Sequence, residues 1–225
     1  MAKRSKRYRE LFSKISPNPV SLEEAVALLK KFATTKFDQS VETVLRLGVD
    51  PKLADQNIRG AISLPHGIGK TVRVAVFAKG DNEEKAKAAG ADIVGADDLA
   101  KRIKEGFTDF DMCLATSDMM GVVGPLGRVL GPKGLMPTPK NGTVTNDIAT
   151  AVREFKAGKV EYRTDPSGNL HVLVGKVSFT DQALVDNIRT LVTTIRQARP
   201  SSVKGVFVQG VTISATMSPG IKVSI

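Results

Sequence analysis

Few residues in this chain are of a type that could carry covalent or acid–base chemistry. Among 225 residues there is one cysteine, Cys113, and there are two histidines, His66 and His171. These three cannot make a tetrahedral zinc site or an internal disulfide. Cys113 lies in an apolar strand pattern, where cysteine is usually packed and inert, and neither histidine has a carboxylate at a triad-like spacing. We therefore predict no catalytic residue, no metal and no cofactor.

The segment Gly67–Thr71 ends like a phosphate-binding P-loop. That motif needs a glycine five residues before its Gly-Lys pair, and Leu64 stands at this position. The segment also precedes an apolar strand pattern, whereas a P-loop follows one. The sequence therefore favours a flexible crossing between domains over a nucleotide site.

The chain is basic. Its 33 Lys and Arg residues exceed its 23 Asp and Glu residues, which gives a net charge of +10. Such an excess favours a polyanionic partner, either nucleic acid or an anionic membrane surface. There is no apolar run long enough to span a bilayer, no signal-peptide core and no long cationic amphipathic helix. We expect a cytoplasmic protein that does not bind membranes.

Hydropathy patterns predict the elements of the first half. Ser21 and Glu24 form a capping-box pattern, which predicts a helix start. Alternating patterns at 41–49 and 58–64 predict half-buried strands. Between 72 and 115, short strands alternate with short helices, as in an open α/β layer.

The second half returns to strands. Asn146 is predicted to cap a helix that Gly158 ends. A hairpin is predicted over 160–174, followed by a long helix capped by Asp181 and a strand at 206–213.

These elements predict an α+β domain formed by both chain ends and interrupted by an inserted, Rossmann-like three-layer α/β domain. The first would comprise residues 1–67 and 160–225, with a net charge of +8, and the second residues 68–159, with +2. A polyanion is therefore expected on the discontinuous domain. The two crossings would form a hinge from Pro65, His66, Gly67, Gly69, Gly158 and Lys159.

The stretch 119–146 has six glycines, four prolines and no acidic residue. Its apolar residues predict a short helix around 122–130. A basic, acid-free surface suits phosphate contacts, which makes Arg128, Lys133 and Lys140 candidates for secondary RNA contacts. A structural loop with three solvated cations fits the same residues.

Several longer motifs occur in a characteristic order. They are Lys36–Asp38, Asp55–Gly60, Ser63–Gly67, Ser214–Met217 and the segment GVVGPLGRVLGPKGLMP at 121–137. Together they resemble the L-one family of bacterial large-subunit ribosomal proteins over essentially the whole chain. The resemblance implies the nested two-domain fold and no enzymatic activity.

The resemblance also implies partners. It implies a monomer within the ribosome that binds a helical junction of large-subunit rRNA at the mobile stalk near the tRNA exit site. It further implies contact with exit-site tRNA during release of deacylated tRNA, and repression of translation of its own operon mRNA.

Residues matching the family's RNA surface follow from the same resemblance: Lys36, Phe37, Ser40, Ser214, Thr216, Met217 and Ser218, with Arg163 and His171 as further candidates. A lysine can neutralise a phosphate, an aromatic ring can contact a sugar or base, and hydroxyls can pair with 2′-OH groups. The residues alone, without the resemblance, favour core packing of Phe37 and ordinary strand roles for Ser214 and Thr216. The family usually has glycine after the Thr-Met pair, so Ser218-Pro219 predicts an altered backbone approach to RNA.

Two alternatives from other classes remain open. One is a nucleotide- or phosphate-dependent enzyme that uses the α/β domain, and the other is a basic protein on an anionic membrane. The failed P-loop spacing and the missing acid–base constellation count against the first.

Overall fold

The computed structural model describes residues 4–53 and 55–224. The chain forms two compact units, Met1–Gly69 with Val160–Ile225, and Lys70–Lys159. We call them the end unit and the middle unit. The first boundary lies two residues later than the sequence-based one, and because Ile68 and Gly69 are uncharged the net charges stay at +8 and +2.

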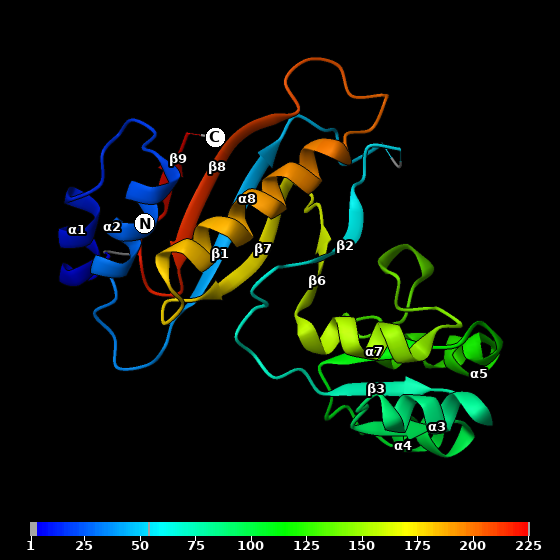
Figure 1. The fold of residues 1–225 in the computed structure, drawn as a ribbon. Coiled ribbons are helices and arrows are strands. Elements are labelled where there is room, and N and C mark those ends of the chain that lie inside the picture. Colours follow the sequence, from blue (N-terminus) through cyan, green and yellow to red (C-terminus); the bar gives the residue numbers. More distant parts are fainter. Residues whose placement is uncertain (1–3, 54, 225) are drawn as a thin grey trace. The chain divides into compact units, whose positions relative to one another are not determined.

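A four-stranded antiparallel sheet organises the end unit (Figure 1). Its strand order is β7-β1-β8-β9, and a separate two-stranded sheet pairs β2 with β6. The elements of this unit are α1 (Lys6–Ser13), α2 (Leu22–Lys31), β1 (Ser40–Leu47), β2 (Arg59–Ser63), β6 (Lys159–Arg163), β7 (Asn169–Lys176), α8 (Asp181–Gln197), β8 (Val208–Ala215) and β9 (Ile221–Val223).

The alternation predicted for the first strand is confirmed, because buried and exposed positions alternate along β1. Its buried side chains face α2 and α8, which pack on each other and on the sheet. The core there is made by Val26, Leu29, Leu45, Ile188, Leu191 and Ile195. The opposite face of the sheet carries Glu42, Val44 and Arg46 and is open to solvent.

Side chains cap the N-termini of α2 and α8. The capping box is confirmed, since Ser21 accepts from the backbone N–H of Glu24 and Glu24 accepts in return. The cap predicted for α8 is wrong by one residue. Thr180 Oγ1 accepts from the N–H of Ala183 at 3.2 Å, and Asp181 lies in the first turn, where its charge favours the positive end of the helix dipole.

The predicted hairpin over 160–174 is wrong. β6 pairs with β2, whereas β7 pairs with β1, and between the two arms the described residues show only the bridge Thr164–Leu170. The turn itself is present, with the Asp165 carboxylate accepting from the N–H groups of Ser167 and Asn169. Each arm of the expected hairpin therefore pairs with a strand far away in the sequence and not with the other arm.

In the middle unit, helices lie on both faces of a parallel sheet of order β4-β3-β5. Phe77 and Cys113 face a core formed with α4 and with Leu126 and Leu130, while α3 and α7 contact β3 from the other face. The elements are β3 (Val74–Phe77), α3 (Asp81–Ala88), β4 (Ile93–Gly95), α4 (Asp97–Lys104), β5 (Met112–Ala115), α5 (Met120–Val123), α6 (Gly127–Leu130) and α7 (Ile148–Ala157).

Two predictions in this unit need correction. The helix expected around 122–130 is broken into α5, a 3-10 turn at Gly124–Leu126 and α6, because Pro125 lacks a backbone N–H for a continuous α-helix. The cap of α7 is Asp147, which accepts from the N–H of Thr150, and not Asn146. The predicted end at Gly158 is confirmed, with a φ of 108° that favours glycine.

Among the described residues, no helix has the length and apolar character needed to cross a membrane.

The capping box gives a stability prediction. Ser21→Ala should lower the free energy of unfolding by about 1 kcal/mol, because the N–H of Glu24 loses its acceptor. Urea unfolding followed by circular dichroism measures this. Ser202→Ala is the control, since Ser202 is exposed and its side chain forms no hydrogen bond in the described part of the chain. Equal midpoints for the two variants would contradict the prediction.

Candidate nucleic-acid interface

Three strand ends meet at one edge of the four-stranded sheet. Ser40, at the start of β1, pairs with Lys176 at the end of β7, and Val41 pairs with Ala215 at the end of β8. In an antiparallel sheet, the residues before one strand lie beside those after its neighbour. The chain segments 36–40 and 214–218 are therefore brought together. We call Lys36, Phe37, Ser40, Thr216, Met217 and Ser218 the sheet-edge cluster.

Hydrogen bonds join the two segments. The N–H of Thr216 donates to Ser40 O at 3.1 Å, and the N–H of Ser40 donates to Thr216 Oγ1, also at 3.1 Å. The N–H of Met217 donates to Gln39 Oε1 at 3.0 Å, and Gln39 is buried. Thr216 therefore positions the cluster, and the backbone around it is held before any ligand binds.

Ser218 has a structural role of its own. Ser218 Oγ accepts from the N–H of Ala215 at 2.8 Å, and its own N–H donates to Ala215 O at 2.9 Å. Its hydroxyl thereby stabilises the turn after β8. Pro219, which follows, is buried.

Two apolar side chains of the cluster project into solvent. Phe37 is 53% exposed and Met217 is 47% exposed, and they are two of five large hydrophobic residues that are exposed in the described part of the chain. Core packing of Phe37 is thus wrong. Lys36, beside Phe37, is exposed as well. Exposed apolar groups next to a cation suit a ligand with flat faces and negative charges.

The N-terminal helix adds cations that sequence reasoning missed. Arg7 Nη2 donates to Met217 O at 3.2 Å, and the Arg4 guanidinium lies 4.6 Å from the centre of the Tyr8 ring. A surface pocket of about 490 Å³ lies between helix and turn, lined by Arg4, Ser5, Arg7, Tyr8, Thr216, Met217 and Ser218. The basic N-terminus is visible in the sequence, but its place beside β8 depends on tertiary folding.

Lys176 was also missed. Its Nζ donates to Ser40 Oγ at 2.8 Å, which places an ammonium group at the edge of the cluster. The nearby acid Asp38 is engaged, since it accepts from both the N–H and the hydroxyl of Ser178. Lys36, Lys176 and Arg7 therefore share this edge with a nearby carboxylate, that of Asp38. Only the register between β1 and β7 could have identified Lys176, and no local sequence signal gives that register.

The structure does not bring all candidates together. His171 pairs with Val44, four residues along β1 from Ser40, which is a distance of about 13 Å. Its Nε2 lies 3.6 Å from Asp165 Oδ2, and the backbone N–H of Asn169 lowers the pKa of that carboxyl.

Arg163 and Ser214 also lie outside the cluster's edge. Arg163 is on β6, in the other sheet, and lines a separate pocket with Lys52 and Asn57. Ser214 is half-buried on the open face and pairs with Glu42.

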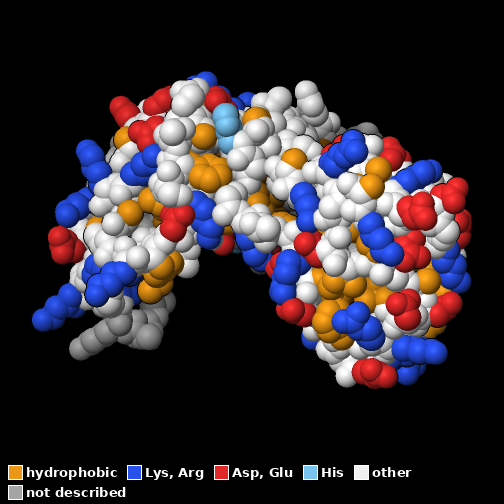
Figure 2. Space-filling view, turned by 60° about the horizontal axis from the view of Figure 1, so that its bottom comes forward, with side chains coloured by type: hydrophobic (Ala, Val, Ile, Leu, Met, Phe, Trp, Pro, Cys, Tyr) orange, Lys and Arg blue, Asp and Glu red, His pale blue; other side chains and the backbone are white. Residues whose placement is uncertain are grey.

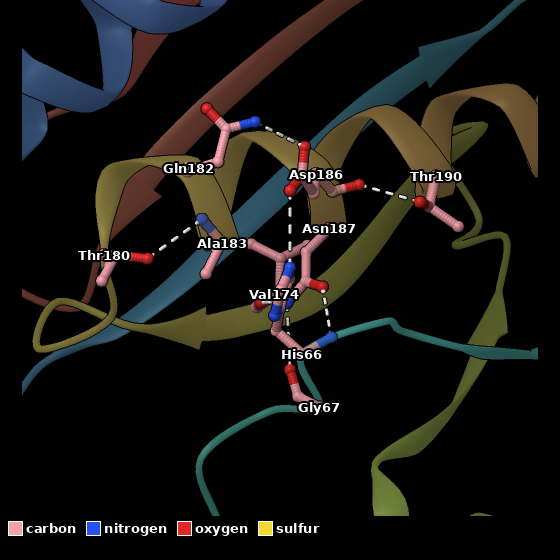
Figure 3. A network of polar contacts seen from close by, with 9 residues as sticks. All are labelled: His66, Gly67, Val174, Thr180, Gln182, Ala183, Asp186, Asn187 and Thr190. Atoms are coloured by element: carbon pink, nitrogen blue, oxygen red, sulfur yellow. Dashed lines mark hydrogen bonds and ion pairs between the residues drawn. The ribbon is translucent and has the colours of Figure 1, made fainter.

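The predicted crossing at 65–69 is tied to α8 (Figure 3). The N–H of His66 donates to Asn187 Oδ1 at 3.1 Å, and Asn187 Nδ2 donates to Gly67 O and to Val174 O. His66 Nε2 also lies 3.4 Å from Asp186 Oδ2. Because Asn187 is fully buried and both ends of its amide are used, it fixes this segment in the end unit. Pro65, His66 and Gly67 therefore belong to an anchored segment.

Gly69, the last residue of that crossing, lies close to the side chain of Phe179. A Cβ at Gly69 would lie 2.8 Å from a ring carbon of Phe179, and its φ is +68°, so only glycine fits there without strain. At the second crossing, Gly158 ends α7, and Lys159 Nζ pairs with Glu154 at 2.6 Å. The hinge role of these residues stays a prediction.

The candidate secondary contacts lie on the middle unit. Arg128, Lys133 and Lys140 are exposed, and Lys133 Nζ donates to Thr108 Oγ1 at 2.7 Å. Figure 2 shows Lys and Arg side chains mixed with Asp and Glu over this unit, on the right of the view, which agrees with its net charge of +2.

The middle unit offers no sign of a nucleotide or nucleophile site. Lys70, the P-loop-like lysine, pairs with Asp111 at 2.6 Å. Cys113 is buried, and burial raises the pKa of its thiol to about 12. Within the ranges that the structure describes, no group of three His, Cys, Asp or Glu residues could hold a metal.

The hydrogen bonds around Ser40 and Met217 hold a cation-bearing surface in place, which makes the sheet-edge cluster a candidate binding surface. A family model described as the ribosomal protein L1p/L10e family matches residues 29–219 of the 225. The chain belongs to this family. Its members are structural proteins of the large ribosomal subunit that bind rRNA, and they are not enzymes. A protein of this family is part of the ribosome, which is cytoplasmic. The enzyme alternative is thereby excluded.

Burial of Cys113 predicts its reactivity. The native protein should not react with a thiol reagent such as DTNB at about pH 8, because that pH lies far below the raised pKa and the sulfur is inaccessible. One thiol per chain should react in denaturant. Rapid reaction of the folded protein would contradict the structure.

Proposed function

We propose that the end unit binds a helical junction of large-subunit rRNA through the sheet-edge cluster, with Arg4, Arg7 and Lys176 at its border. The observation that carries this proposal is the meeting of exposed Phe37 and Met217 with several cations at one edge of the sheet. Half or more of protein–nucleic acid hydrogen bonds go to phosphate and sugar. Lys36, Arg4 and Arg7 supply such contacts.

The chemistry of the cluster suits folded RNA. Phe37 and Met217 offer apolar surface to a sugar or an unstacked base, and base–aromatic stacking contributes about 1–3 kcal/mol. The Ser40 hydroxyl accepts from Lys176 Nζ, and a hydroxyl of this kind can pair with a 2′-OH. These contacts distinguish RNA by shape and sugar, and by base sequence only to a small extent.

The cluster is organised before binding. Both of its segments are joined by backbone hydrogen bonds at strand ends, so little conformational entropy is lost when RNA binds. A rigid surface suits a rigid RNA junction, and Ser218 stiffens it further by closing the turn.

We extend the proposal to the two units. The end unit is the RNA-binding domain, and the middle unit is a Rossmann-like inserted domain that moves relative to it about Gly69–Lys70 and Gly158–Lys159. The anchoring of His66 and Gly67 by Asn187 supports a pivot after this segment. In the ribosome the protein would act as a monomer on the mobile stalk near the tRNA exit site, contact exit-site tRNA and assist release of deacylated tRNA. Arg128, Lys133 and Lys140 are available for secondary contacts.

A folded mRNA with the same junction shape would bind the same cluster. Binding to the operon mRNA that encodes the protein would then compete with binding to rRNA and repress translation when rRNA is saturated. This regulatory role depends on the cluster recognising shape.

Filter binding of a large-subunit rRNA stalk fragment tests the proposal. If Lys36, Arg4 and Arg7 each neutralise a phosphate, log K should fall with log salt with a slope of about −2 to −3. Affinity that does not change with salt, or no affinity for the fragment, would overturn the proposal.

Exposed apolar residues allow a matched comparison. Phe37→Ala and Met217→Ala should each weaken binding of this fragment about tenfold, which corresponds to about 1.4 kcal/mol. Leu53→Ala is the control, because Leu53 is also 47% exposed and lies outside the cluster. All three substitutions remove exposed apolar groups, so equal losses in the three variants would show that RNA does not use the cluster.

A further inference from the structure

A second cationic surface lies at the other end of β1. A groove of about 610 Å³ lies along the edge of β8, between residues of the open face of the four-stranded sheet and Arg196 near the end of α8. Its lining includes Arg46, Asn169, Arg196, Gln209, Thr212 and Lys222, and it contains no Asp or Glu. We call it the open-face groove. We propose that it binds a second RNA segment through the phosphate backbone, separately from the sheet-edge cluster.

Strand register creates the groove. Arg46 on β1 pairs with Asn169 on β7 and with Gly210 on β8, and Thr212 on β8 pairs with Lys222 on β9. Paired residues point to the same face of a sheet. Asn169, Arg46 and Gly210 therefore form one cross-strand row. Thr212 and Lys222 lie in the next row toward Ser40, and both rows are on the face opposite α2 and α8.

Two cations of the groove, Arg46 and Lys222, are available. Neither Arg46 nor Lys222 forms an ion pair with any residue that the structure describes, and both are exposed. Along β1 the nearest acid on the same face is Glu42, four residues or about 13 Å away, and beside β7 the Asp165 carboxylate accepts from Asn169 and lies 3.6 Å from His171. Cations that form no ion pair produce a positive potential that attracts a polyanion.

The groove has space and backbone groups for a sugar–phosphate chain. β9 pairs with β8 at Val211–Ile213, so among the described residues the Val208–Gly210 edge of β8 has no strand beside it on that side. A Cβ built on Gly210 meets no atom within 4 Å, so the groove is open above it. The side-chain amide of Gln209 adds a donor.

The composition of the lining favours phosphate over base recognition. No aromatic residue is among the lining side chains, so there is no stacking platform for bases. Guanidinium, ammonium and amide groups bind phosphate oxygens without reading sequence. The groove should therefore bind RNA with little sequence preference and with strong salt dependence.

The two surfaces are separate. Arg46 lies six positions along β1 from Ser40, which spans about 20 Å at about 3.3 Å per residue. One RNA segment can thus occupy the cluster while another lies in the groove. Both surfaces are on the unit with a net charge of +8.

A labelled poly-uridine RNA of about 12 nucleotides, titrated against the full chain at about 50 mM salt, tests the proposal. Arg46→Glu with Lys222→Glu should weaken binding at least tenfold. The control, Lys85→Glu with Lys104→Glu, changes the net charge equally with exposed lysines of the middle unit and should bind nearly as the unmodified chain does. Arg46→Ala with Lys222→Ala is a milder pair for use if the charge reversals unfold the protein.

Nuclear magnetic resonance locates the bound RNA. The side-chain amide signals of Asn169 and Gln209 should shift on titration and should not shift in the glutamate pair. Three results would overturn the proposal. They are an equal loss of RNA affinity in the two glutamate double variants, amide signals that do not shift, and tighter binding of poly-glutamate than of RNA. The double variant Arg46→Glu with Lys222→Glu should bind the stalk fragment about as tightly as the control double variant does. A failed groove proposal can therefore be distinguished from a failed proposal for the sheet-edge cluster.

Discussion

The central position of β1 in the four-stranded sheet is the constraint on which the rest of the structure depends. β1 comes early in the chain, and it pairs on one side with β7 and on the other with β8, both more than a hundred residues later. This pairing holds the two chain ends in one unit and leaves the residues between them to form another. It also determines which side chains meet at each end of the sheet.

Both RNA surfaces proposed for this chain follow from that register. At one end of β1, Ser40 meets Thr216 and Lys176, and at the other end Arg46 meets Asn169 and Gly210. The helices α2 and α8 cover one face and supply the hydrophobic core, so the polar face remains available. The middle unit has a net charge of only +2, against +8 for the end unit.

Structural features that depend on a few neighbouring residues could be predicted from the sequence. The capping box at Ser21, the alternation along β1 and the left-handed glycine at the end of α7 each depend on a few neighbouring residues. Charge counting also placed the basic excess in the end segments. The motif resemblance supplied the candidate residues 36–40 and 214–218, and the structure brings most of them to one edge.

Features that depend on residues far away in the sequence could not be predicted. The hairpin over 160–174 was expected because its arms are adjacent in sequence, yet each arm pairs with a strand from the first seventy residues. Lys176 and Arg7 reach the sheet-edge cluster only through tertiary pairing. The caps Thr180 and Asp147 compete with neighbours of similar propensity, and backbone geometry decides between them.

Site-specific crosslinking tests the central claim, that rRNA binds at the edge where the chain ends meet. Cys113 is the single cysteine and is buried, so a cysteine introduced at the surface can be labelled selectively. Met217→Cys and Leu53→Cys replace equally exposed residues inside and outside the sheet-edge cluster. With a short photoreactive label and the stalk fragment, the account predicts efficient crosslinking from position 217 and little from position 53. Equal yields, or a higher yield from position 53, would contradict it.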